Sequence, residues 1–379
     1  MDYEEFCSFD NLYTAYRKAR LGKRGKKAEA SFEYHAIEHL LILSKELRNE
    51  TFEPGALTTF HIFEPKERLI QAPTFKDKIV QHAMTDGVIY EALSKSFIRD
   101  NVAAQYGKGT HYGLNRLEVQ MRDYFLKRKG RDEAARKAAG LPYRPAEEWD
   151  YADGWVLKGD VHHFFASIDH EKLKERLATR FNDERFQRLM WKFIDAADGL
   201  ALGHQTSHIY AVDFLSPVDH NIKERLRIRY YGRYADDFYL IHESKEHLQF
   251  CLAEITRELA SIGLELNDKT NILPLKNGID FCGFHTYLTQ SGKVVRKLRR
   301  SSVKRNKRHM NAWEAEYRAG EVTREKIMER FQSCEAHAKH GDTRQLREEM
   351  RKRVLKIFET EKEQSPCHSY SQISPTAAS

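Results

Sequence analysis

The stretch that decides the fold is RIRYYGRYADDFYLIH, residues 227–242. Two runs rich in β-branched and aromatic residues meet at Ala235-Asp236-Asp237, which predicts a β-hairpin with the acidic pair at its turn. Adjacent acids within a strand point to opposite faces, whereas at a turn both carboxylates can reach one point. Two such charges beside apolar residues are costly unless a cation or water compensates them. The stretch therefore indicates either a cation site or an ordinary exposed turn.

A third carboxylate, Asp160, ends the strand-like run WVLKGD at residues 155–160. If this strand pairs beside the hairpin, Asp160 lies next to Asp236 and Asp237. Hard divalent ions take oxygen ligands, and two ions about 3.5–4 Å apart support in-line phosphoryl transfer. The three acids therefore favour a nucleotidyl transferase with two Mg²⁺ ions, for which Mn²⁺ can substitute. One ion would activate a 3′-hydroxyl and the other would hold the triphosphate.

Composition and charge set the broad class of protein. The 379 residues, 41% of them hydrophobic, suit one large or two to three smaller domains with a packed core. Lys and Arg number 63 against 56 Asp and Glu, and the net charge of +7 favours a polyanionic partner. Two blocks without any acid, residues 16–27 and 291–310, concentrate this charge. Such blocks suit nucleic-acid phosphates, although a solvated helix face is the alternative.

The cysteines, and the absence of apolar runs long enough to span a membrane, indicate the cellular compartment of the protein. The five cysteines contain no C-x-x-C pair, which argues against a disulfide framework and for a reducing compartment. The acidic start MDYEEFCSFD does not resemble a signal peptide, and no apolar run approaches a membrane span. We therefore expect a soluble cytoplasmic protein without a membrane partner.

Hydrophobic periodicity predicts alternating helices and strands without regular βαβ spacing. The expected helices are residues 32–50, 76–96, 169–180, 245–262 and 300–357. The expected strands are residues 58–63, 69–71 and 155–160, the two runs of 227–242, and a pair within 278–288. The Met and aromatic residues of 76–96 are expected to be core. Residues 126–150 are polar and interrupted by Pro, which indicates a surface insertion. This pattern favours an α+β fold, an antiparallel sheet with helices packed on one face.

A series of short motifs follows in chain order. They are FEPKERLI (63–70), FKDKIVQHA (75–83), KGTH (108–111), KGD (158–160) with FFASID (164–169), LG (202–203) with TS (206–207), RYADDF (233–238), GLELN (263–267) with KT (269–270), and FCGF (281–284). The series resembles the ordered motifs of reverse transcriptases, particularly the group II intron-like bacterial branch. LYTAYRK (12–18) and RSSVKR (300–305) are most similar to the diversity-generating retroelement reverse transcriptases. Divergent defence-associated reverse transcriptases are the alternative subfamily.

The resemblance implies a catalytic or metal-binding role for several residues. Asp160, Asp236 and Asp237 would be the metal ligands, and Val161 belongs to the same metal site. Lys269 would donate a proton to the leaving pyrophosphate.

The resemblance also implies a nucleotide pocket. Its residues would be Lys66, Arg68, Phe165, Gly203, Ser207 and His208. Lys66 and Arg68 would clamp the triphosphate, which suits the bidentate phosphate contacts of Arg. Phe165 would be a steric gate whose ring excludes a 2′-hydroxyl and so favours dNTPs over rNTPs.

The implied architecture is a right-hand polymerase. Residues 1–290 would form fingers and palm, including the insertion at 126–150. Residues 291–360 would form a helical thumb, and residues 361–379 a disordered tail.

The implied function is RNA-directed DNA synthesis in a prokaryotic retroelement or antiviral defence system. The partners would be a structured RNA template or non-coding RNA, the cDNA product, dNTPs, and an accessory protein or a second copy of the chain. Three departures from the family pattern stand out: Gln105 for Arg, Lys78 for Arg, and His208 for Gln. The changes at Gln105 and His208 motivate an alternative in phage defence, a polymerase with non-templated or highly restricted template use. A further alternative is a non-catalytic RNA-binding scaffold that kept the polymerase fold.

Overall fold

The computed structural model describes residues 1–23, 27–64 and 66–359. The expected tail at 361–379 and residues 24–26 of the first basic block lie outside the described residues. The chain divides into two compact units. The first unit contains residues 1–282 and 288–294, and the second contains residues 283–287 and those from 295 onward.

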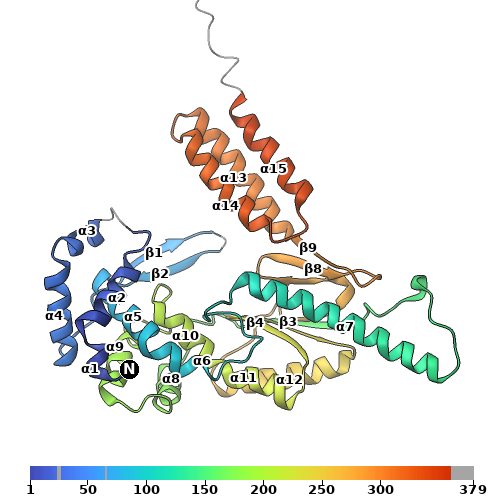
Figure 1. Cartoon of the computed structure of the whole chain (residues 1–379), viewed down its shortest axis with the longest axis horizontal. Coiled ribbons are helices and arrows are strands. Elements are labelled where there is room, and N and C mark those ends of the chain that lie inside the picture. Colours follow the sequence, from blue (N-terminus) through green and yellow to red (C-terminus); the bar gives the residue numbers. More distant parts are fainter. Residues whose placement is uncertain (24–26, 65, 360–379) are drawn as a thin grey trace, which may run out of the picture. The chain divides into compact units, whose positions relative to one another are not determined.

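The first unit opens with helices and one β-hairpin (Figure 1). Its elements up to residue 94 are α1 (Tyr3–Phe6), α2 (Phe9–Ala19), α3 (Lys27–Tyr34), α4 (Ala36–Arg48), β1 (Thr58–Ile62), β2 (Arg68–Ala72), α5 (Phe75–Met84), the π-helical turn η1 (Thr85–Ile89) and α6 (Tyr90–Ser94). A capping box begins α5, because Thr74 and Asp77 each accept a hydrogen bond from the other's backbone N–H. The hairpin pairs Ile62 with Arg68, which places Arg68 next to its turn.

The rest of the first unit adds more helices and the central sheet. Its elements are α7 (Thr110–Ala138), η2 (Ala146–Glu148), β3 (Trp155–Asp160), α8 (His170–Ala178), α9 (Glu184–Ile194), α10 (Gln205–Phe214), α11 (Ser216–His220), η3 (Asn221–Arg225), β4 (Tyr230–Tyr234), β5 (Asp237–His242), α12 (Lys245–Ser261), β6 (Asn271–Pro274) and η4 (Leu275–Asn277). The remaining strands are β7 (Ile279–Phe281), β8 (Phe284–Leu288) and β9 (Val294–Leu298), and β8 pairs with β9.

The central sheet has the order β4-β5-β3-β6, and every neighbouring pair is antiparallel. The predicted α+β class with an antiparallel sheet is confirmed. The prediction that helices cover one face is wrong, since α7 lies on one side of the sheet and α11 and α12 lie on the other (Figure 1). Helices cover both faces of the sheet because alternate residues of a strand point to opposite faces. Val156 and Ile241 pack in the cluster that includes α7, whereas Leu157 and Leu240 pack in the cluster that includes α12.

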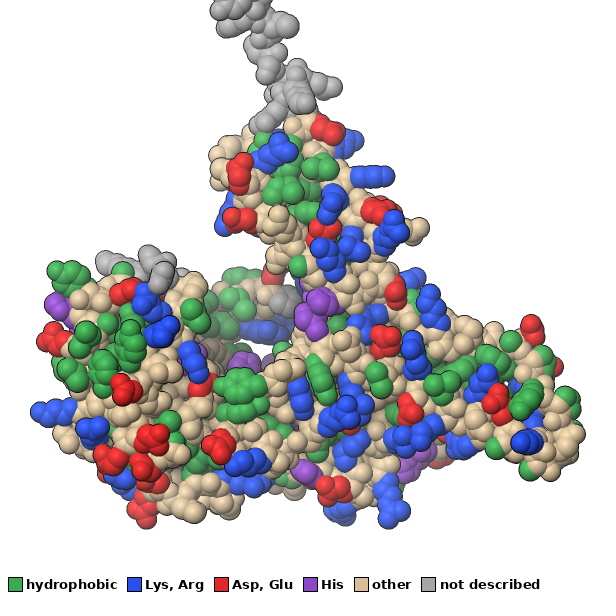
Figure 2. Space-filling model, viewed as in Figure 1, with side chains coloured by type: hydrophobic (Ala, Val, Ile, Leu, Met, Phe, Trp, Pro, Cys, Tyr) green, Lys and Arg blue, Asp and Glu red, His purple; other side chains and the backbone are tan. Residues whose placement is uncertain are grey.

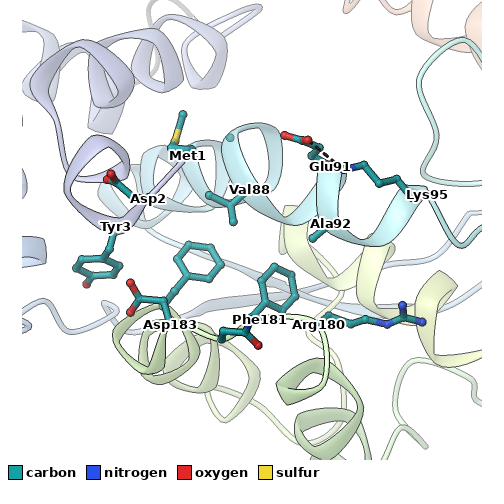
Figure 3. Close-up of a pocket in the computed structure, with 13 residues that line it drawn as sticks. Met1, Asp2, Tyr3, Val88, Glu91, Ala92, Lys95, Arg180, Phe181 and Asp183 are labelled. Carbon is teal, nitrogen blue, oxygen red and sulfur yellow. Dashed lines mark hydrogen bonds and ion pairs between the residues drawn. The ribbon is translucent and has the colours of Figure 1, made fainter.

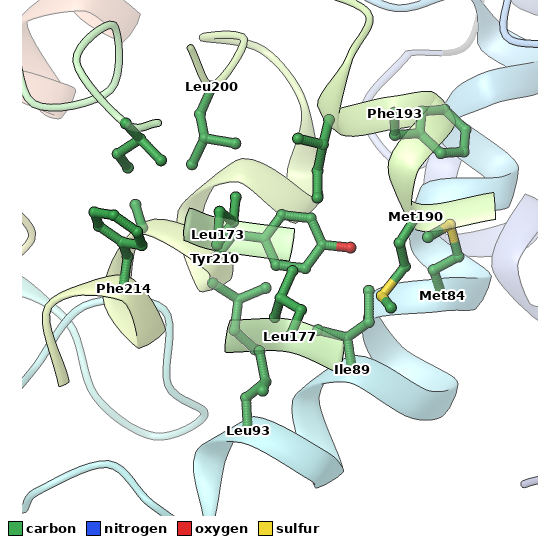
Figure 4. Close-up of a cluster of buried hydrophobic side chains, with 14 of the residues drawn as sticks. Met84, Ile89, Leu93, Leu173, Leu177, Met190, Phe193, Leu200, Tyr210 and Phe214 are labelled. Atoms are coloured by element: carbon green, nitrogen blue, oxygen red, sulfur yellow. The ribbon is translucent and has the colours of Figure 1, made fainter. Parts of the chain in front are cut away.

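The largest core cluster gathers helices that are far apart in the sequence (Figure 4). Its members include Met84, Ile89, Leu93, Leu173, Leu177, Met190, Phe193, Tyr210 and Phe214. The expectation that the Met and aromatic residues of 76–96 are core is confirmed for Met84, which is buried, while Tyr90 packs against the same cluster and is partly buried. Among the described residues, no helix is both long and apolar enough to cross a membrane.

The second unit contains three helices after β9. They are α13 (Arg300–Arg318), α14 (Arg324–Ala338) and α15 (Arg344–Ile357). Their shared core includes Met310, Trp313, Ile327, Phe331, Met350 and Val354. The sequence pattern predicted helix from 300 to 357 without marking the breaks. Gly320, at a φ of 72°, ends α13, and the Thr323 side chain then accepts a hydrogen bond from the Lys326 backbone N–H to begin α14.

Two other boundaries differ from the sequence prediction. The expected helix at 32–50 is divided at His35, whose ψ of 36° leaves the helical region, and its second part ends at Arg48 with Asn49 as the C-cap. The first half of the expected insertion at 126–150 is the C-terminal part of α7, which continues to Ala138. The prolines that suggested a break lie beyond that end, and Gly140, at a φ of 67°, stops the helix.

A buried ion pair holds the hairpin formed by β4 and β5. Arg233 is 2% exposed and Asp219 is 1% exposed. Arg233 Nε donates to Asp219 Oδ1 at 2.8 Å, and the Tyr231 hydroxyl donates to the same oxygen at 2.6 Å. Arg233 Nη1 also donates to the Ala235 carbonyl oxygen at 2.8 Å. The guanidinium therefore connects α11 directly to the turn that carries Asp236.

We predict that Asp219→Ala lowers the free energy of unfolding by about 3–5 kcal/mol, because it leaves a buried guanidinium without its counter-ion. Urea unfolding followed by tryptophan fluorescence measures the change. The double variant Asp219→Leu/Arg233→Met should recover most of the loss, and Asp10→Ala, on the exposed start of α2, should change stability little. A single-variant loss below about 1 kcal/mol would contradict the prediction.

Candidate active site

The acidic pair lies at a tight turn, as the sequence predicted. β4 ends at Tyr234 and β5 begins at Asp237, with Tyr234 and Asp237 opposite each other in the register. Ala235 adopts a φ of 55°, the left-handed conformation that short hairpin turns require. Gly232, within β4, lies so close to the Tyr239 side chain that an added Cβ would lie 2.5 Å from its hydroxyl oxygen.

β3 lies beside β5 and brings Asp160 to the same end of the sheet. The register places the Cα of Asp160 opposite that of Asp237, and Gly159 opposite Phe238. An added Cβ on Gly159 would overlap the Phe238 ring, so this ring requires glycine there. The Val161 backbone N–H donates to the Asp236 carbonyl oxygen at 3.3 Å. The expected pairing of the WVLKGD strand beside the hairpin is therefore present.

Asp160 and Asp236 form a like-charge pair that is partly buried. Burial, and then the charge of Asp160, raise the pKa of Asp236 above its usual value. The cationic groups of Lys66 and Arg68 oppose this rise in pKa. The structure thus brings these four predicted site residues within electrostatic range of one another.

The third carboxylate is compensated by the protein itself. Asp237 forms an ion pair with Lys158, whose Nζ also donates to the Phe238 carbonyl oxygen at 3.3 Å. Sequence reasoning missed Lys158, although a residue two positions before Asp160 in a strand shares its face of the sheet. Within residues 1–23, 27–64 and 66–359, no group of three or more Asp, Glu, His or Cys side chains has metal-binding geometry.

The donor set at this end of the sheet nevertheless fits a hard divalent cation. Asp160 and Asp236 supply carboxylate oxygens, and burial together with the charge of Asp160 raises the pKa of Asp236. Asp237 would have to exchange its Lys158 contact to join them. The metal site with Asp160, Val161, Asp236 and Asp237 stays a prediction.

The segment that carries Lys269 is attached to the end of β3 by backbone hydrogen bonds. The Asn267 N–H donates to the Asp160 carbonyl oxygen and the His162 N–H donates to the Glu265 carbonyl oxygen, each at 2.8 Å. Lys269 is exposed, and its side chain forms no hydrogen bond or ion pair with any described residue. Its expected role as a proton donor stays a prediction.

The aromatic gate residue meets one of the unusual pocket residues. The rings of Phe165 and His208 lie 5.3 Å apart at 72°, an edge-to-face contact. Desolvation by the surrounding protein lowers the pKa of His208, which favours its neutral form. His208 is exposed, whereas its neighbour Ser207 is buried, with 2% of its surface exposed.

Gly203 allows close approach to the hairpin that carries Lys66 and Arg68. It adopts a φ of 136°, and an added Cβ would lie 2.6 Å from the Gln71 carbonyl oxygen. The Gln71 N–H donates to the Leu202 carbonyl oxygen at 2.8 Å. These contacts attach β2 to the pocket loop through backbone atoms.

A separate cavity of about 300 Å³ contains none of the predicted site residues (Figure 3). It lies between the start of the chain, α6 and the segment around Phe181, and Glu91 and Lys95 form an ion pair at its edge. We assign it no role in catalysis.

Comparison with known proteins identifies the family. The sequence profile described as "Reverse transcriptase (RNA-dependent DNA polymerase)" matches residues 65–286, more than half of the chain. The chain belongs to the reverse transcriptase family. This membership confirms the predicted enzyme class, an RNA-directed DNA polymerase, and agrees with the predicted right-hand polymerase fold. The predicted subfamily stays a prediction.

Individual relatives are distant. Protein YkfC of Escherichia coli (strain K12) is 25% identical over 301 residues, which cover 65% of this chain and 71% of that protein. The apo telomerase of Candida tropicalis truncated from its C-terminal domain is 16% identical, with a TM-score of 0.44, and the match covers 69% of this chain and 60% of the telomerase. The Candida albicans telomerase in complex with the TWJ fragment of telomeric RNA is 15% identical, with a TM-score of 0.42. This match covers 68% of this chain and 49% of the telomerase. The chain thus spans between about half and three-fifths of these telomerase chains.

We predict that, without divalent metal, Asp236→Asn raises the midpoint of thermal unfolding at pH 7.5. The raised pKa of Asp236 means that the folded chain holds the neutral carboxyl better than the charged one. As pH falls through that raised pKa, the wild-type carboxyl gains its proton, so the advantage of the variant should shrink towards pH 4. Thermal unfolding in EDTA across this range measures the difference, with Asp10→Ala as control. An advantage that grows with acidification would contradict the prediction.

Proposed function

We propose that the chain copies RNA into cDNA from dNTPs by two-metal phosphoryl transfer at Asp160 and Asp236. The observation that carries this proposal is the partly buried pair of carboxylates within electrostatic range of Lys66 and Arg68. An anionic centre suits divalent cations, and adjacent cations suit a nucleoside triphosphate. All four residues lie within the span that matches the reverse transcriptase family.

The chain's own residues would act mainly by positioning charge. Asp160 and Asp236 would hold the ions, and Asp237 would join them on leaving Lys158. Bound Mg²⁺ would supply charge neutralisation and lower the pKa of the attacking 3′-hydroxyl. Lys66 and Arg68 would orient the triphosphate. Lys269 would donate a proton to the leaving pyrophosphate from the segment attached to Asp160.

Selection of the sugar would depend on Phe165. Its ring is partly exposed and lies against His208, which limits the directions in which it can turn. A ring held in this way would collide with a 2′-hydroxyl and leave a deoxyribose undisturbed.

The biological setting follows from the resemblance of the motifs. We propose a prokaryotic retroelement or antiviral defence system in which the enzyme works with a dedicated structured RNA, and with an accessory protein or a second copy of the chain. LYTAYRK (12–18) and RSSVKR (300–305) support the diversity-generating branch, whereas His208 and Gln105 support the defence-associated branch.

A second candidate function is synthesis with restricted or no templating. The conformation of Gln105 favours it, because its Nε2 donates to the Asn101 carbonyl oxygen at 2.7 Å and so is bound to backbone. A pocket with one fewer cation for the triphosphate would hold nucleotides differently. Extension reactions that omit one dNTP at a time separate the two functions, since ordinary copying stops at the missing complement.

We predict that Asp236→Ala reduces dNTP incorporation on an RNA template with a DNA primer by at least about 10³-fold. This is the loss expected when several kcal/mol of transition-state stabilisation disappear. Asp10→Ala, on the exposed start of α2, is the matched control and should retain activity. If the wild-type chain incorporates no dNTP with Mg²⁺ on any primer–template, the proposal is wrong. If Asp236→Ala retains the biological function, the scaffold alternative is favoured instead.

We predict that Phe165→Val raises the ratio of kcat/KM for rNTPs to that for dNTPs by about tenfold or more, because a smaller side chain admits the 2′-hydroxyl. Single-nucleotide incorporation with matched rNTP and dNTP measures the ratio. Tyr143→Ala changes an aromatic residue that is 70% exposed and should leave the ratio unchanged. An unchanged ratio in the Phe165 variant would remove this residue from sugar selection.

A further inference from the structure

A basic groove lies in the first unit, at the end of the β4–β5 hairpin away from Asp236. It has a volume of about 410 Å³ and is formed by α7, the approach to β4 and the end of β5. The charged side chains that line it are Lys127, Arg131, Arg227, Arg229 and Glu243. Figure 2 shows Lys and Arg side chains gathered over α7 and the neighbouring part of the first unit.

The groove is separate from the acidic centre. Tyr230 and Ile241, which line the groove, face each other at the start of β4 and near the end of β5. From Tyr230 to the turn at Ala235 is five residues, or about 16 Å at the usual rise of a strand. A ligand in the groove would therefore not need to touch Asp160 or Asp236.

Two of the four cations in the groove are available to a ligand. Arg131 is paired with Glu243, and Arg229 is paired with Asp123 at 3.1 Å. The side chains of Lys127 and Arg227 form no hydrogen bond or ion pair with any described residue, and both residues are exposed. Lys127 and Arg131 are four residues apart on α7, so they share one helix face. This charge is complementary to a polyanion.

A row of aromatic rings continues from the groove onto α12. The ring of His242, which lines the groove, lies 4.4 Å from that of His247. The ring of His247 lies 6.3 Å from that of Phe250 at an angle of 32°. Phe250 is 54% exposed, an uncommon setting for so large an apolar side chain. Exposed ring faces beside basic side chains are the arrangement on which unpaired bases stack.

We infer that the groove and the aromatic row bind a single-stranded segment of RNA, away from the primer–template. Lys127 and Arg227 contact phosphates, and Phe250 stacks on a base. A duplex keeps its bases stacked inside and cannot use the ring of Phe250, and an acidic peptide would use the cations alone. The inference goes beyond the proposed polymerase function, since it concerns how an RNA is held rather than how it is copied.

The test uses the full chain with a fluorescent single-stranded RNA 20-mer of mixed sequence. Excess unlabelled RNA–DNA primer–template is present, so that the acidic centre is not the site observed. Lys127→Ala/Arg227→Ala should weaken binding about tenfold and reduce the slope of log affinity against log salt by about 1.4, which is about 0.7 for each phosphate that no longer meets a cation. Phe250→Ala should weaken binding about fivefold or more. Fluorescence anisotropy at several salt concentrations measures both effects.

Matched controls exclude effects of net charge and of exposed aromatic rings. Lys45→Ala/Arg180→Ala removes two exposed cations elsewhere in the first unit, and Tyr143→Ala removes an exposed ring. Both controls should bind as the wild-type chain does. Crosslinking with a 4-thiouridine version of the same RNA should label peptides from residues 227–250.

Several outcomes would overturn the inference. One is an equal loss of RNA affinity in the groove and control variants. A second is equally tight binding of a double-stranded RNA 20-mer. A third is displacement of the RNA by a poly-glutamate peptide of equal charge, which would indicate a protein partner. Primer extension on a separate short template should stay within about twofold of wild type in the groove variants. If RNA binds the groove but the chain has no polymerase activity, only the proposed function is overturned. If the chain has polymerase activity but RNA does not bind the groove, only this inference is overturned.

Discussion

The structure depends on the buried contact between Arg233 and Asp219. A guanidinium cannot lose its proton in a protein, so Arg233 must keep a counter-ion once it is buried. Its side chain binds Asp219 and the Ala235 carbonyl oxygen, while its backbone N–H and C=O bond to Asp100 and Val102. The turn that carries Asp236 is therefore held from α11 on one side and from the 100–102 segment on the other.

The charges at this turn are unequally compensated. Lys158 forms an ion pair with Asp237 within the protein, whereas burial, and then the charge of Asp160, raise the pKa of Asp236. Lys66 and Arg68 act on Asp236 from the β1–β2 hairpin, which is itself attached through Gln71. The folded chain thus retains an unbalanced pair of carboxylates at one place. That imbalance would give a divalent cation its affinity for the site.

The sequence predicted features that depend on local pattern and missed those that depend on distant partners. The hairpin at Ala235 and the convergence of Asp160 with Asp236 follow from strand alternation and turn chemistry, and both are present. The pairing of Arg233 with Asp219 could not be predicted, because it requires knowing how α11 packs against β4. The Lys158 contact was accessible in principle from its two-residue spacing to Asp160. The extension of α7 was missed because a polar, solvated helix end and a polar loop have similar compositions.

Gln105, one of the departures from the family pattern, contacts the same 100–102 segment that holds the turn. Gln105 Nε2 and Lys108 Nζ both donate to the Asn101 carbonyl oxygen, and Asn101 forms a bridge with Arg233. From the family resemblance we expect a cation for the triphosphate at this position. In this chain the residue instead supports the strand beneath the acidic centre. In the proposed mechanism, triphosphate binding would then depend more heavily on Lys66 and Arg68, and so on the placement of β2. That placement is fixed by the Gln71–Leu202 hydrogen bond and by the close approach that only glycine permits at Gly203. Nucleotide affinity and the geometry of the pocket loop should therefore change together in this enzyme.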